Sequence, residues 1–440
     1  MASRGAVAPA SADLMTIAAR LWSLFRRHYH ASTVQHAVVL MAFVGPAFLA
    51  NLLVYYFTAR ILSAEDFGTF YVAITIGNVL YSGSLLLSIF LTRYLVQVGA
   101  TGLAEMVEAA RQVQRTVGFW GIPLSAAAFV LLTALSGSLG VQSVLVALLI
   151  ILDTYASYLA DIGRAFLQSR QQTWQLGTYT LVWMVLRLAL SVLGAALFGT
   201  VWSPLLGSAL AAVLSFAGFQ MILRRAAAPL RRAFAKPPAF ANLIPVVLGY
   251  GLLTVISNLD VLLSYFLLKD SAIGIYSASS VFPKGLLMVT MPVSQLLFAA
   301  LLGDHESEDA FRTTVRTTIW VVGVLTAGAA LAVWLLTPWL CGGDFGLKLC
   351  APMPLDILLI SAVLLSILRM TVLLEFVKQR DWLILSLLFP TLAYLVVAFV
   401  STPGVETMAV QFAIFSAVAL VFFTAIQLGS GSWRHVPWRR

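Results

Sequence analysis

Long apolar stretches with few charges follow one another from about residue 35 to about residue 428. Of the 440 residues, 60% are hydrophobic and 10% are charged, whereas a soluble domain is about 45–50% apolar and about 25% charged. A spanning helix needs about 20 apolar residues, so the chain has room for on the order of a dozen. The pattern predicts an all-α polytopic membrane protein. It excludes a soluble globule, a disordered chain, and an outer-membrane barrel, whose strands alternate over about 10 residues.

Twelve spans account for the apolar stretches. They are expected at 35–59, 70–92, 116–137, 142–162, 175–197, 203–222, 243–267, 274–301, 315–337, 354–377, 382–400 and 406–428. The longest basic linker follows the sixth span. We therefore predict five segments, which are an N-terminal cytoplasmic segment with an amphipathic helix (1–34), a first six-helix lobe (35–222), a basic cytoplasmic linker (223–242), a second six-helix lobe (243–428) and a basic cytoplasmic tail (429–440).

The distribution of Lys and Arg predicts how the spans are oriented. With the N-terminus inside, three of the 27 basic residues (Arg60, Lys269 and Lys348) fall in outer loops and three in spans, which leaves 21 in inner segments. Cytoplasmic loops of membrane proteins carry such an excess. Both termini are therefore expected in the cytoplasm. The net charge of +9 has this explanation and does not indicate nucleic-acid binding.

The two lobes show weak internal similarity at a nearly constant offset. Asn51 corresponds to Asn258, Gly68 to Gly274 and Trp174 to Trp382, at offsets of 207, 206 and 208 residues. Each lobe contains an even number of spans, so both have the same orientation. The similarity predicts a duplicated fold whose symmetry axis lies along the membrane normal, with a site between the halves, as in transporters built from parallel repeats.

A polar stripe runs along the fourth span. Its members fall within an arc of about 80° on a helix and are Asp153, Ser157, Asp161, Arg164 and Gln168. A charge in the middle of the bilayer costs about 3 kcal/mol unless it meets water or a partner, so the stripe is not expected to face lipid. Arg187 of span five is expected to pair with Asp153, either as a structural ion pair or as part of a cavity-lining site.

Further charges lie within spans of the second lobe. Asp260 and Lys284 are expected at similar depth in spans seven and eight, and Arg369 near the middle of span ten. Glu375 is expected to reach the inner interface by snorkelling. Arg187, Lys284 and Arg369 together predict an anionic cargo, because Arg and Lys are the side chains that bind phosphate or diphosphate.

The remaining polar residues complete the predicted site. Asn51 and Asn258 are expected to bind substrate with the three cations. Asp153, Asp260, Asp161 and Arg164 are expected to balance charge or to carry a coupling proton or sodium ion. No catalytic motif, metal site or cofactor motif is found, and the outer loops are short, so no enzyme is expected. Cys341 and Cys350 in the largest outer loop are either a disulfide or two free thiols.

Three stretches resemble a known family. RILSAEDFGTFYVAITIGNVL (60–80), RAFLQSRQQ (164–172) and SNLDVLLSYFLLKDSAIGIYSASS (257–280) resemble segments of the Wzx-type oligosaccharide-lipid flippases. These flippases are the polysaccharide-transport branch of the multidrug/oligosaccharidyl-lipid/polysaccharide exporter superfamily. The resemblance covers roughly residues 35–425 in span order and loop length.

The resemblance implies a MATE-like fold of two six-helix lobes around a cationic cavity, with no cofactor. It implies transport of an undecaprenyl-diphosphate-linked repeat unit across a bacterial inner membrane for surface or extracellular polysaccharide synthesis. Asp260 matches the acid of span seven in that family, and Arg187 and Lys284 fall where cavity cations are expected. Twelve spans argue against the fourteen-span lipid II flippases.

Three alternatives stay open. A MATE-type drug or cation antiporter would have the same fold, and a membrane-bound polysaccharide polymerase or ligase would act on related lipid-linked sugars. As a third alternative, the protein is a structural subunit of a larger export machine and works beside the polymerase or export machinery of the same pathway. In each case the chain is expected to contact the lipid bilayer.

Overall fold

The computed structural model of the chain describes residues 31–99, 102–139, 144–170, 172–227, 244–269, 271–301, 308–342, 349–377, 381–401 and 403–429. The predicted amphipathic helix before residue 31, most of the basic linker and the basic tail from residue 430 lie outside these ranges.

The described part of the chain is almost entirely helical. The first half contains α2 (Ala31–Ile61), α3 (Ala64–Gly99), α4 (Leu103–Leu139), α5 (Val144–Ser169), α6 (Thr173–Phe198) and α7 (Trp202–Ala227). The second half contains α8 (Ile244–Leu267), α9 (Ser271–Leu301), α10 (Glu308–Gly342), α11 (Pro352–Val377), the 3-10 helix η2 (Asp381–Leu387), α12 (Leu388–Ser401) and α13 (Val405–Gly429).

The helices correspond in order to the twelve predicted spans, with η2 and α12 together forming the eleventh. Among the described residues, nine helices are long and apolar enough to cross a membrane; α3, α4 and α9 are not among the nine. The first turns of α4 carry the charged residues Glu105, Glu108, Arg111 and Arg115, which lower its hydropathy. The predicted all-α polytopic membrane fold is confirmed.

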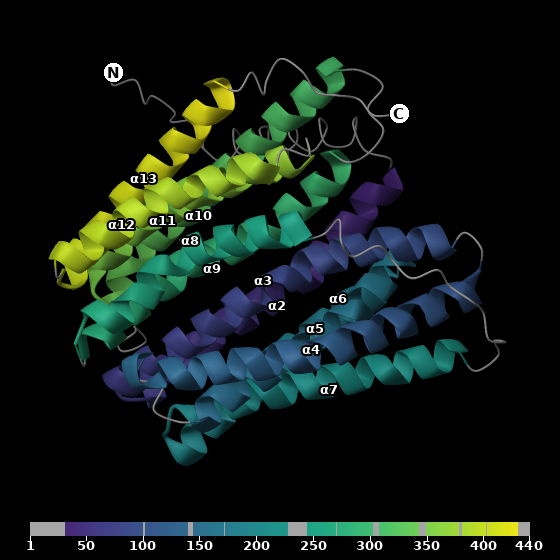
Figure 1. The fold of residues 1–440 in the computed structure, drawn as a ribbon, viewed down its shortest axis with the longest axis horizontal. Helices are drawn as coiled ribbons and strands as arrows, with labels where there is room; N and C mark the ends of the chain where they lie inside the picture. The colour runs from purple at the N-terminus through teal and green to yellow at the C-terminus, as the bar shows by residue number, and fades with distance from the viewer. Residues whose placement is uncertain are drawn as a thin grey trace, which may run out of the picture.

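The helices gather in two groups that follow the order of the chain (Figure 1). Helix α2 packs on α6, α6 on α7, and α5 on α3, α4 and α7. In the second half, α11 contacts α9, α10 and α13, and α12 contacts α13. The groups meet where α3 contacts α8 and α9 and where α2 contacts α9. The predicted five-segment division of the chain stays a prediction.

Local sequence explains why α3 begins where it does. Ser63 precedes the helix, and its hydroxyl oxygen accepts a hydrogen bond from the backbone N–H of Asp66 at 3.1 Å. The Ser63 hydroxyl in turn donates to Asp66 Oδ2 at 2.8 Å. This arrangement satisfies an otherwise unpaired N–H of the first turn. Glu65 and Asp66 also place negative charge at the positive end of the helix dipole.

Two glycines form a close backbone contact between the groups. Gly68 lies in the first turns of α3 and Gly274 in the first turn of α9. A Cβ atom on Gly68 would come within 2.9 Å of the amide nitrogen of Gly274, and a Cβ on Gly274 would overlap the carbonyl oxygen of Ala64. Only glycine therefore permits this approach of α3 to α9. These are the same two glycines that correspond in the predicted internal repeat.

A disulfide joins Cys341 to Cys350 across the connection between α10 and α11. Their Cα atoms are 4.9 Å apart, within the range that a disulfide spans. Cys341 lies in the last turn of α10, and Cys350 is buried two residues before α11 begins. The bond ties the ends of two helices that also pack against each other.

Candidate functional site

A cavity of about 240 Å³ lies between the two groups of helices. Its walls come from α2, α3, α9 and α10, and most of its lining residues are apolar. Its polar lining residues are Asn51, Tyr55, Tyr71 and Lys284, and of all its lining residues only Lys284 carries a charge. The cavity is therefore a largely apolar chamber, and Lys284 is the one charged residue among those that line it.

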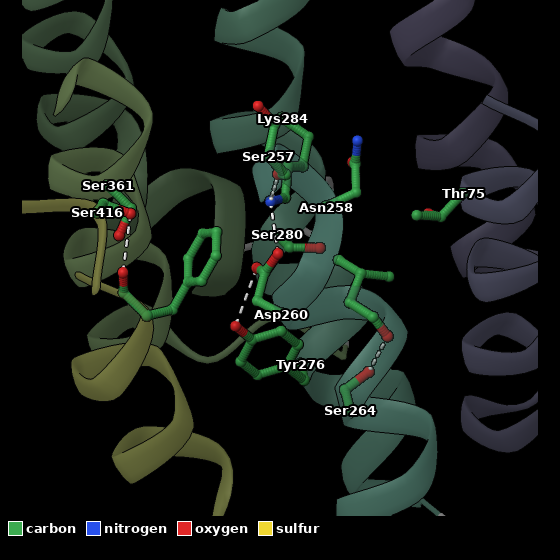
Figure 2. A network of polar contacts seen from close by, with 12 residues as sticks. Thr75, Ser257, Asn258, Asp260, Ser264, Tyr276, Ser280, Lys284, Ser361 and Ser416 are labelled. Atoms are coloured by element: carbon green, nitrogen blue, oxygen red, sulfur yellow. Dashed lines mark hydrogen bonds and ion pairs between the residues drawn. The ribbon is translucent and has the colours of Figure 1, made fainter. Parts of the chain in front are cut away.

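Lys284 of α9 is held by groups of α8 and α13. Its Nζ lies 2.7 Å from Asp260 Oδ1 and also donates to the backbone carbonyl of Ser257 (Figure 2). On another side, the Nζ lies 4.6 Å from the ring centre of Phe412, which is a cation–π distance. Asp260 is 0% exposed and Lys284 7% exposed, so each charge offsets part of the cost of burying the other.

Tyr276 completes the environment of Asp260. Its hydroxyl donates to Asp260 Oδ2 at 3.0 Å (Figure 2). Each carboxylate oxygen of Asp260 therefore accepts a hydrogen bond, one from α9 Tyr276 and one from α9 Lys284. Asp260 itself is not among the residues that line the cavity, so Lys284 stands between the carboxylate and the chamber.

In the first half, Arg187 of α6 joins three helices through its guanidinium group. Its Nε donates to Ser208 Oγ of α7 at 2.8 Å, and a terminal nitrogen donates to Asn51 Oδ1 of α2 at 3.2 Å. The Ser208 hydroxyl donates to Asp153 Oδ2 of α5 at 3.0 Å. Arg187 and Asp153 are 3.7 Å apart as an ion pair. Asn51 lines the cavity and Arg187 does not, so the network reaches the cavity through Asn51.

A second ion pair of the first half lies between Asp161 and Arg164, one turn apart on α5. The Tyr81 hydroxyl of α3 donates to Asp161 and accepts from Arg164, the latter at 2.8 Å. The Arg164 guanidinium also lies 4.3 Å from the ring centre of Trp183. Ser157 and Asp161 of the predicted polar stripe are buried, whereas Gln168 at its end is exposed. The stripe thus faces other helices over most of its length.

Arg369 of α11 is buried inside the second half. Its side chain donates to the backbone carbonyl of Leu287 at 3.3 Å, and its guanidinium lies 5.9 Å from the ring centre of Tyr250. The Nε of Arg369 and the Tyr250 hydroxyl have no hydrogen-bond partner in the described part of the protein. Lys284 lines the cavity and Arg369 does not, so the structure does not bring these two cations together at the cavity.

Two further predicted positions differ in their surroundings. Asn258 lies on α8 on the side of α3 Thr75 (Figure 2), and its amide donates to Thr254 within its own helix at 2.8 Å. The expectation that Glu375 snorkels to the interface is wrong. Glu375 is 0% exposed, and Gln427 Nε2 of α13 donates to its Oε1 at 2.6 Å. Its position near the end of α11 is covered by α13, which a reading of one span does not reveal.

Several partners were missed because they carry no signal of their own in the sequence. Ser208, Tyr81, Trp183, Tyr276 and Phe412 are ordinary residues of apolar helices, and each becomes informative only when its neighbour is known. Across the described ranges, no group of three or more His, Cys, Asp or Glu side chains is arranged to hold a metal ion.

Comparison of the fold with solved structures gives similar proteins along nearly the whole chain. The lipid II flippase MurJ in an inward closed conformation superposes with a TM-score of 0.63 at 14% identity, over 89% of this chain and 87% of that one. A mutant form of the MATE transporter VcmN from Vibrio cholerae superposes with a TM-score of 0.62 at 16% identity, over 92% and 99% of the two chains.

The chain has the fold of the MATE and MurJ transporters. A third structure with this MATE-like fold is a MOP superfamily transporter from Pyrococcus furiosus, with a TM-score of 0.59 at 14% identity over 92% of this chain and 96% of that one. For that protein, the reverse polarity of the binding pocket suggests a different function. No protein-family model and no curated protein matches the sequence. The structural similarity establishes the MATE-like fold. At identities this low it does not identify the cargo, which has to be inferred from the chemistry of the site.

Proposed function

We propose that the protein is a flippase for an undecaprenyl-diphosphate-linked oligosaccharide repeat unit. It would move this amphiphile by alternating access from the inner to the outer leaflet of a bacterial inner membrane, for surface or extracellular polysaccharide synthesis. A transporter fold supports this general role. The proposal for the cargo rests on one observation, which is that Lys284 is the single charged residue lining a largely apolar cavity between the halves.

The composition of the cavity wall favours an anionic amphiphile. Phe48, Leu49, Leu52, Phe282 and Val333 offer apolar surface for a hydrocarbon chain. Lys284 offers a positive charge for a phosphate, which Lys binds as a point charge. Transfer of a diphosphate through hydrocarbon is unfavourable because desolvation of an ion costs many kcal/mol. A pathway that supplies a cation at the lobe interface lowers this cost.

Arg187 of the first half provides a second positive charge near the cavity. Its guanidinium is bonded to Asn51, which lines the cavity. The group made of Arg187 and Asp153 is neutral overall, and both residues are bonded to Ser208 of α7, but only Arg187 has a described hydrogen bond to the cavity-lining Asn51. In our proposal, Asn51 contacts the glycan or the second phosphate after Lys284 binds the first, and Arg187 acts on the cargo through Asn51.

A MATE-type antiporter of cationic drugs is the second candidate, because MATE transporters share the fold. An organic cation requires a carboxylate within reach of its binding cavity. No carboxylate is among the lining residues of this cavity, and the nearest one described beside Lys284, Asp260, is occupied by that ammonium. The charge of the cavity wall therefore favours the anionic cargo. A polymerase or ligase is the third candidate and has no observation in its favour.

A reconstituted assay tests the proposal directly. The purified protein is placed in lipid vesicles with a fluorescent prenyl-diphosphate-linked sugar, and the fraction that becomes accessible to a quencher outside is followed over time. We expect the wild type to move the probe and Lys284→Gln to reduce the rate at least about tenfold, the factor for 1.4 kcal/mol. Arg60→Gln, which removes an exposed cation at the end of α2, is the matched control and should transport normally.

A cationic dye in the same vesicles separates the second candidate. Transport of the dye without transport of the diphosphate-linked probe would contradict the flippase proposal. In cells, Arg187→Ala and Lys284→Ala are expected to abolish glycan export while the folded protein persists in the membrane. Single repeat units should then accumulate on the inner leaflet, whereas loss of a polymerase would leave them on the outer leaflet. Normal surface polysaccharide in both variants would refute the proposed roles.

A further inference from the structure

Lys284 belongs to two environments at once. Lys284 is one of the residues that line the interlobe cavity, and its Nζ lies 2.7 Å from the fully buried carboxylate of Asp260. Arg187, in contrast, keeps its contacts away from the cavity lining and reaches it only through Asn51. A ligand that draws the Lys284 ammonium into the cavity therefore competes with Asp260 for it.

We infer that an anionic ligand entering the cavity takes Lys284 from Asp260, and that Asp260 then binds one proton from water. This inference rests on the proposed function, since it assigns proton coupling to the same anion-binding site. The ammonium keeps all three of its protons and exchanges a carboxylate oxygen for a phosphate oxygen. No proton passes from Lys284 to Asp260, because a neutral amine would no longer attract the anion.

The surroundings of Asp260 explain why the proton is needed. When Lys284 leaves, the Tyr276 hydroxyl is the one remaining hydrogen-bond donor that the described structure places on the carboxylate. An ionised carboxylate is strongly disfavoured in a desolvated position without an opposite charge. The ammonium group and the proton are therefore alternative ways to neutralise Asp260.

The other titratable groups around the pair do not replace this function. Tyr71 of α3, Tyr276 of α9 and Tyr394 of α12 lie within electrostatic reach of Asp260, and phenols ionise only near pH 10 in water. Arg369 of α11 lies within reach of Lys284, but it donates its hydrogen bond to the Leu287 carbonyl. On α13, the group that faces Lys284 is the neutral ring of Phe412.

Calorimetry of the full-length protein in lipid nanodiscs tests the inference. Farnesyl diphosphate serves as the probe at pH 8, where its phosphates are ionised, and binding is measured in two buffers of different ionisation enthalpy to give the number of protons taken up. We expect the wild type to bind about one proton more than Asp260→Asn does per probe bound. The Asn variant reports any change in protonation of the probe itself, so the difference belongs to Asp260.

Inorganic diphosphate forms a second arm. If the ligand is an amphiphile, it should bind more weakly than the prenylated probe but with the same proton uptake. Equal affinity would identify a free diphosphate as the ligand and leave the proton linkage supported. The double variant Asp260→Asn with Lys284→Gln removes both charges, is expected to fold because no unpaired ion remains, and should bind the probe at least about tenfold more weakly.

The experiment distinguishes a failure of the inference from a failure of the proposed function. Binding of the probe to the wild type with the same proton count as Asp260→Asn would overturn the inference and leave the proposed function in place. Absence of any binding of prenyl diphosphate to the wild type, while the nanodisc protein is folded, would overturn the proposed function and the inference with it.

Discussion

Arg187 reaches the interlobe cavity through Asn51, whose side-chain oxygen accepts a hydrogen bond from the guanidinium at 3.2 Å. Asn51 lines the cavity and Arg187 does not. The cation of the first half therefore acts on a ligand across a neutral amide, whereas Lys284 of the second half meets the ligand directly. The two lobes contribute positive charge in different ways, although the predicted duplication would make them equivalent.

Replacing Asn51 by Asp should weaken binding of an anionic ligand. The new carboxylate would pair with Arg187 and would place a negative charge on the cavity wall, so we expect the affinity for farnesyl diphosphate to fall about tenfold, the factor for 1.4 kcal/mol. Asn51→Ser removes the amide without adding charge and should change the affinity by less than about threefold. Equal loss in both variants, measured by calorimetry in nanodiscs, would show that charge is not the cause.

Arg187 and Asp153 should be coupled in stability. Arg187→Gln and Asp153→Asn each leave one ion of the 3.7 Å pair without its opposite charge, so each single variant should unfold more readily. The double variant should lose less free energy of unfolding than the two single variants lose together, with a coupling free energy of about 1–3 kcal/mol. Unfolding by denaturant in mixed micelles measures all four proteins. Additivity within about 0.5 kcal/mol would contradict an energetically significant pair.

Enlarging Gly274 should separate α3 from α9 at the end where both helices begin. A Cβ on Gly274 would overlap the backbone of Ala64, so Gly274→Val should increase the distance between spin labels at Arg60 and Lys269 by about 3 Å or more, roughly the displacement that a side-chain layer requires. Gly218→Val is the matched control, because a Cβ there meets nothing within 4 Å. An unchanged distance in a folded Gly274→Val protein would show that the contact does not set the approach of the helices.

Removal of the disulfide should lower stability moderately. The bond between Cys341 and Cys350 closes a loop of nine positions, for which the chain-entropy treatment gives about 2–3 kcal/mol. Cys341→Ser with Cys350→Ser should therefore unfold at lower temperature in detergent, and transport should persist because both residues lie outside the proposed ligand contacts. The reduced wild type should match the double variant. If a reductant opens the bond in the wild type and the unfolding temperature does not change, this expectation is wrong.

Sequence patterns determined the architecture well. Apolar runs of spanning length predicted the helices in order, but several helices extend well beyond the predicted spans, as α4 (Leu103–Leu139) does beyond 116–137. The paired glycines illustrate how far such patterns reach. The offset of 206 residues between Gly68 and Gly274 indicated equivalent positions in two halves, but only the fold brings their backbones into contact.

The site was less accessible because its contacts join helices that are distant in sequence. Depth within a span predicted that Asp260 and Lys284 lie at the same level, and the structure pairs them. Depth could not indicate rotation about the helix axis, which separates Lys284 on the cavity wall from Arg369 in the interior of its lobe. Glu375 shows the same difficulty, since a carboxylate near a helix end is buried only because α13 covers it.

On the Gly274 side of this contact the nearest atoms of α3 are backbone atoms of Ala64, so no side chain of α3 can rotate aside there. Parting the halves at that end therefore requires whole helices to shift as rods. In our proposal, a cargo bound beside Lys284 leaves in that direction only after these helices part.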